Sequence, residues 1–126
     1  MVQERPLSPH LMIYRRQLTS MMSISHRLSG ATLAAGSLML VWWVAALASG
    51  PEYYSMVQAI MMSIPARMVL FGFTAAIFYH LSNGIRHLFW DFGIGLTIEG
   101  VYRSGYVVMA STLVLTLGLW ALVLFG

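Results

Sequence analysis

The chain has 126 residues, of which 59% are hydrophobic and only 9% are charged, so it must face lipid or a large apolar partner. Its formal net charge is +3, but the seven basic residues are all arginines, too few and too dispersed for a nucleic-acid interface. Cysteine is absent, which excludes disulfides, thiolate metal ligands and haem attached through cysteine.

The first 48 residues predict an extended arm followed by a long helix. Pro6 and Pro9 disfavour helix in the N-terminal arm, which we expect to cover residues 1–19. An apolar run without a charge fills residues 28–48, and we expect a helix over 20–48. Such a helix is about 43 Å long, which exceeds the hydrocarbon core. Its first two turns are therefore expected at the membrane surface.

The second predicted span is less uniform than the first. Gly50 and Pro51 end the first helix, and residues 52–62 are typical of a short interfacial segment. A helix is expected over 66–91. Its first half is apolar, but its second half includes His80, Asn83, Arg86 and His87.

The third helix is expected over 104–126, again without a charge. Arginines are concentrated in the N-terminal arm, the first turns of the first helix and the second loop, whereas the first loop has only one. The positive-inside rule therefore places the N-terminus inside and the C-terminus outside. The sequence predicts an all-α integral membrane protein with three transmembrane helices, which form one membrane-anchor domain over residues 1–126.

His80 lies well inside the second span, where an ionisable side chain usually faces a protein interior and serves a function. His87 is seven residues further on, only about 20° away around the helix axis. Gly84 leaves a flat space beside His80, which either a porphyrin plane or another backbone could occupy. The alternative is a neutral histidine that hydrogen-bonds a carbonyl or a serine on a neighbouring helix.

A single helix cannot supply both axial ligands of one iron. His80 and His87 lie about 10.5 Å apart along one helix, and axial ligands must approach from opposite faces of the macrocycle. His10 and His26 are expected too near the surface, which points to a second ligand from another chain. The methionines in or near the spans offer the only self-contained alternative: Met39, Met68 and Met109.

Ser23, His26 and Arg27 share one face of the first helix, because they are spaced i, i+3 and i+4. Arginine presents five donors that suit carboxylates, including haem propionates, and serine can bond a carbonyl oxygen. The alternative is topological: Arg27 keeps the helix end at the surface, and Ser23 is an ordinary interfacial residue. For Arg86 and Asp91 we expect a solvated, salt-bridged helix end.

Two motifs span the chain. The first is Arg5-Pro6-Leu7-Ser8-Pro9-His10, continued by Ser23-x-x-His26-Arg27-x-Ser29-Gly30, and the second is His80-x-x-x-Gly84-Ile85-Arg86-His87-Leu88-x-x-Asp91-x-Gly93. In order, length and number of spans, the whole chain resembles the cytochrome b (large anchor) subunit family of succinate dehydrogenase, also called complex II.

The resemblance implies a heterodimeric anchor bundle with a cofactor between its two chains. His80 would be an axial ligand of haem b, which is shared with a histidine of the small anchor subunit. Ser23 and Arg27 correspond to residues that line the ubiquinone pocket. His26, Arg27 and His87 would lie on the haem propionate side.

The resemblance also implies the reaction of a succinate:ubiquinone oxidoreductase. Electrons from succinate would pass from FAD in the flavoprotein subunit, through clusters in the iron–sulfur subunit, to ubiquinone at the anchor. This chain would hold no succinate-oxidising residue. Its partners would be those two subunits, the small anchor subunit and the lipid bilayer, with no nucleic acid.

The expected location is a bacterial inner membrane, or a mitochondrial inner membrane for a processed chain. An anchor of a quinol:fumarate reductase is an alternative, because the reaction is reversible. A small transporter with His80 in a proton relay and a purely structural anchor are alternatives from other classes.

Overall fold

The computed structural model describes residues 17–126, and these residues are helical except at short connections. Four helices follow one another along the chain: α1 (Leu18–Ala48), α2 (Pro51–Met61), α3 (Ile64–Asp91) and α4 (Ile98–Phe125). The motif over residues 5–10, and residues 1–16 of the expected extended arm, lie outside the described residues.

Three of these helices, α1, α3 and α4, are long and apolar enough to cross a membrane. Three candidate spans were expected, and the all-helical character and the number of spans are confirmed. Most of the large apolar side chains on these helices are exposed in the isolated chain. A soluble protein does not present such a surface, whereas a lipid-facing helix does.

The helices begin slightly earlier than hydropathy predicts. α1 begins at Leu18 after Gln17, whose side chain makes no capping hydrogen bond. α3 begins at Ile64, where the Oγ of Ser63 accepts a hydrogen bond from the backbone N–H of Ala66. The difference is two residues in each case, because hydropathy marks the part of a helix that lies in the hydrocarbon and does not mark where its first turn begins.

The largest difference is at the start of α4, which was expected at 104 and lies at Ile98. Gly93 and Gly95 adopt positive φ angles of 75° and 77°, which turn the chain sharply after α3. Thr97 then caps the new helix, with its Oγ1 accepting from the N–H of Gly100 at 3.1 Å. The first turns of α4 carry charges, so a search for apolar runs does not include them.

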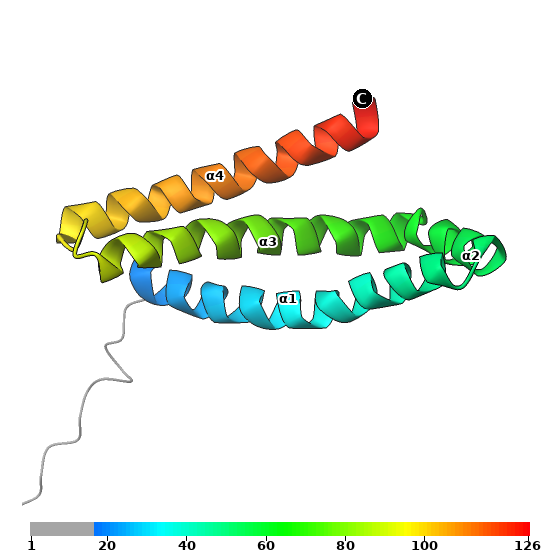
Figure 1. Cartoon of the computed structure of the whole chain (residues 1–126). Coiled ribbons are helices and arrows are strands. Elements are labelled where there is room, and N and C mark those ends of the chain that lie inside the picture. The colour runs from blue at the N-terminus through cyan, green and yellow to red at the C-terminus, as the bar shows by residue number, and fades with distance from the viewer. Residues whose placement is uncertain (1–16) are drawn as a thin grey trace, which may run out of the picture.

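α3 lies between α1 and α4, and it runs antiparallel to both of them (Figure 1). The start of α1 lies beside the end of α3 and the turn to α4. α2, which covers the segment expected to be interfacial, joins α1 and α3 at the opposite end. α4 stays close to α3 near the turn and diverges from it toward the C-terminus.

α1 and α3 approach closely where α1 carries glycines. A Cβ on Gly36 would collide with the ring of Phe73. A Cβ on Gly30 would lie 3.2 Å from Cε1 of His80, tighter than ordinary van der Waals contact. Small residues commonly allow this kind of backbone approach in membrane helices. The glycines of α1 therefore set how near the α3 side chains lie.

Candidate functional site

Three histidines from two helices meet near the turn between α3 and α4. α1 and α3 are antiparallel, so the first half of α1 lies against the second half of α3. The ring of His26 stacks on the ring of His80, with centroids 4.0 Å apart and an interplanar angle of 8°. The ring centroid of His87 lies 5.4 Å from that of His26, and these two rings are tilted by 42° to each other.

One ring nitrogen of His80 is held by α1. Its Nδ1 lies 3.0 Å from Oγ of Ser29 and 3.3 Å from the carbonyl oxygen of His26. Among residues 17–126, Nε2 of His80 makes no hydrogen bond. The contact to a serine and a carbonyl is the one that the alternative interpretation of His80 predicted. It occupies only Nδ1, so it leaves Nε2 to bind a ligand or metal.

Open space lies beside the same face of α3. A Cβ on Gly84, one turn from His80, would meet no other atom within 4 Å. The Nδ1 of His26 is buried and has no hydrogen-bond partner in the described part of the chain. One free imidazole nitrogen beside open space fits a haem that is held by histidine.

The three imidazoles are not arranged to bind a bare metal ion. In residues 17–126, no group of three or more histidine, aspartate or glutamate side chains is placed to hold one. His26 stacks on His80 instead of converging with it on a common point. The ring of His87 packs edge-on against Trp90, with centroids 5.0 Å apart.

Ser23 and Arg27 flank the histidines on an exposed side of α1. Their α1 neighbour His26 turns toward α3, so the three residues that share a face in sequence do not share an environment. Neither Ser23 nor Arg27 has a side-chain partner among the described residues. Their hydrogen-bonding groups are therefore available to a ligand or to another subunit.

Arg86 corrects one expectation, because it is buried (5% exposed) and is not part of a solvated helix end. Its Nε–H donates to Oγ of Ser104 at 2.9 Å, and its Nη2 donates to the carbonyl oxygen of Val101, also at 2.9 Å. Its Nη1 donates to Oδ1 of Asn83 at 3.2 Å. Asp91 is exposed, and it forms no ion pair in the described part of the chain.

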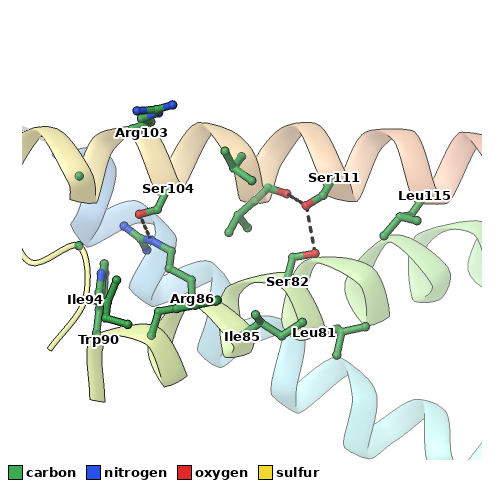
Figure 2. Close-up of a pocket in the computed structure, with 15 residues that line it drawn as sticks. Leu81, Ser82, Ile85, Arg86, Trp90, Ile94, Arg103, Ser104, Ser111 and Leu115 are labelled. Carbon is green, nitrogen blue, oxygen red and sulfur yellow. Dashed lines mark hydrogen bonds between the residues drawn. The ribbon is translucent and has the colours of Figure 1, made fainter. Parts of the chain in front are cut away.

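Figure 2 shows Arg86 extending from α3 toward Ser104 on α4, and both residues line a cleft of about 560 Å³ between the two helices. Further along the cleft, Ser111 of α4 donates to Ser82 of α3 at 3.1 Å. These polar contacts join α4 to α3. Sequence spacing could not find them, because they depend on how α4 is placed along α3.

Comparisons with known proteins agree with this architecture. A family model described as "Succinate dehydrogenase/Fumarate reductase transmembrane subunit" matches residues 1–119. The succinate dehydrogenase cytochrome b556 subunit of Rickettsia typhi is 40% identical over 117 residues, which cover 93% of this chain and 91% of the relative.

Two further relatives come from different lineages. The cytochrome b556 subunit of Paracoccus denitrificans is 39% identical over 111 residues, 88% of this chain and 85% of the relative. The mitochondrial cytochrome b560 subunit of Homo sapiens is 41% identical over 122 residues, 94% of this chain and 71% of the relative.

Proposed function

Because the chain belongs to the succinate dehydrogenase/fumarate reductase transmembrane subunit family, as a cytochrome b subunit of the succinate dehydrogenase anchor, we propose that it holds haem b through His80. We further propose that it helps form the site where ubiquinone is reduced. The chain is a multi-pass membrane protein and a subunit of the enzyme. The proposal concerns which residues of this chain bind the haem and ubiquinone, and how they do so.

The observation that carries the haem proposal is the engagement of Nδ1 of His80 by α1, which leaves Nε2 free. Histidines that bind metals almost always donate their other ring N–H to an oxygen acceptor. A haem b bound there would supply one-electron transfer. The role of this chain is to present one imidazole at a fixed angle, with Gly84 leaving room beside it.

His26 and His87 are proposed to lie on the propionate side. His26 is half-buried, and an imidazole nitrogen can hydrogen-bond a carboxylate. His87 is only half-buried and lies against Trp90. Arg27 can add a charge-assisted hydrogen bond to a propionate from the exposed side of α1.

Ser23 and Arg27 are proposed to bind ubiquinone. Both side chains are exposed and unpartnered among the described residues. They lie in the first turns of α1, at the end of the bundle where α3 turns into α4. A serine hydroxyl can donate to a quinone carbonyl oxygen. The guanidinium of Arg27 can stabilise negative charge that develops on that oxygen during reduction, as donors do in an oxyanion hole.

The proposal extends to the orientation of the chain in the membrane and to the other subunits of the assembly. The N-terminus and the turn between α3 and α4 would face the inside, and the C-terminus the outside, in one membrane-anchor domain. A small anchor subunit would complete the heterodimeric bundle and supply the second axial histidine. FAD and iron–sulfur clusters would reside in the flavoprotein and iron–sulfur subunits, since this chain has no cysteine to bind a cluster.

The experiment is to replace His80 with leucine in the assembled complex and record its reduced absorption spectrum. We expect the b-type band to disappear while the chain still inserts into the membrane. His87→Leu is the matched control on the same helix and should keep the band, with only a shifted position. A normal low-spin spectrum from His80→Leu would refute the proposed ligand.

A further inference from the structure

Ser29 is a buried polar residue of α1 with 7% of its surface exposed. Its hydroxyl donates to the carbonyl oxygen of His26 at 2.8 Å, one turn back in the same helix. The same Oγ lies 3.0 Å from Nδ1 of His80 on α3. Ser29 therefore links the backbone of α1 to the imidazole of α3.

The hydrogen bonds around this hydroxyl favour one tautomer of His80. A serine hydroxyl has one proton, and donation to the His26 carbonyl uses it. Its oxygen must then accept the proton of Nδ1–H of His80. The His26 carbonyl, 3.3 Å from the same nitrogen, can also only accept. The tautomer with the proton on Nδ1 and the lone pair on Nε2 satisfies both neighbours at once.

Two other contacts fix the plane of the His80 ring but do not determine which edge of the ring faces Ser29. The His26 ring stacks on one face at 4.0 Å, and Gly30 allows Cε1 to approach α1 closely. A ring turned over by 180° would keep the stacking. It would, however, place a carbon where Nδ1 now meets Ser29 and would lose the hydrogen bond. The Ser29 hydroxyl distinguishes the two orientations.

We propose that Ser29 is the positioning residue for the axial imidazole, an inference that rests on the proposed ligation by His80. Its hydroxyl accepts from Nδ1–H, which sets the tautomer and the rotation of the ring and would leave Nε2 free to bind the haem iron. A hydrogen bond from Nδ1–H also raises the basicity of the ligand, which favours ferric over ferrous iron. Ser29 thereby lowers the reduction potential.

Ser29 is also the acceptor that can be removed by substitution. The second acceptor is a backbone carbonyl, which remains whatever side chain replaces His26. Ser29→Ala leaves that longer contact alone and removes the 3.0 Å one. Ser29→Thr retains a hydroxyl at the same position. Ser37→Ala is the matched control, because the exposed Ser37 bonds only Ala34 of its own helix.

The experiment measures the midpoint potential of the haem in the purified complex by redox titration, together with the ferric electron paramagnetic resonance spectrum. Ser29→Ala should shift the potential to more positive values and change the low-spin g-values. It should also weaken haem retention on dilution by about 10- to 100-fold. Ser29→Thr should restore the original values, and Ser37→Ala should not alter them.

The outcomes separate this inference from the ligand assignment. If Ser29→Ala loses its haem while Ser29→Thr retains it, the inference is also supported, because the hydroxyl is then required for ligation. An unchanged potential and spectrum in Ser29→Ala would overturn it. So would equal shifts in Ser29→Ala and Ser29→Thr, which would indicate packing. If His80→Leu keeps a low-spin haem, it is the ligand assignment that fails.

Discussion

Replacing Ser104 with alanine tests whether the buried guanidinium joins α4 to α3. The substitution removes the 2.9 Å acceptor of the Arg86 Nε–H, at a site where only 5% of the arginine is exposed. A hydrogen bond to a charged group contributes about 1.5–3 kcal/mol. Val101 and Asn83 keep their own bonds to Arg86, so the expected loss in unfolding free energy is about 1.5–3 kcal/mol.

The assay is SDS-induced unfolding of the detergent-solubilised complex, followed by tryptophan fluorescence. Ser37→Ala, on an exposed side of α1, should change the unfolding free energy by less than about 0.5 kcal/mol. In an Arg86→Met background, Ser104→Ala should also cost less than about 0.5 kcal/mol, because the hydroxyl no longer has its charged partner. Equal losses with and without Arg86 would refute the reasoning.

Two further predictions concern quinone reduction and helix packing. Arg27→Leu and Ser23→Ala should slow succinate:quinone turnover, Arg27→Leu by roughly ten- to hundredfold for a lost bond from a charged donor. Turnover with a soluble acceptor should stay unchanged, and equal loss of both activities would contradict a quinone role. Gly36→Ala should destabilise the complex by about 1–3 kcal/mol in SDS titrations, because its Cβ meets the Phe73 ring. Gly118→Ala, with open space around it, should be neutral; if the two variants are equally stable, the close contact is not real.

The sequence predicts the spans well, because a membrane imposes a simple rule on composition. Runs of about 20 apolar residues identify α1 and α4, and the apolar first half of α3 identifies that helix, without any knowledge of packing. The same rule fails at the polar ends of helices. The first turns of α4 carry Glu99 and Arg103, and only the cap at Thr97 marks where that helix begins.

The arrangement of the site is less accessible from sequence. Periodicity places His80 and Gly84 on one stripe of α3, and it predicts that His80 and His87 do not bind the same iron. It cannot tell that His26 stacks on His80, since that contact depends on how α1 and α3 align. Ser29, three residues after His26, was part of a motif but had no chemical role until the helices were brought together.

Arg86 shows the opposite error. Its position beside His87, near a polar helix end, favoured a solvated side chain. In the structure, Val101 and Ser104 of α4 cover it and accept its hydrogen bonds. Asn83, three residues earlier on α3, was the available indication, because its amide oxygen can satisfy a buried donor on the same face.

The central claim is that haem b lies between two anchor chains, with His80 as the only axial ligand from this one. The most direct measurement is to express this chain with and without the small anchor subunit and record the haem absorption and electron paramagnetic resonance spectra of each. With the partner, the account predicts a low-spin, six-coordinate haem. The chain alone should bind haem weakly or in a high-spin, five-coordinate form. A full low-spin spectrum from the monomeric chain alone would contradict the shared-ligand account.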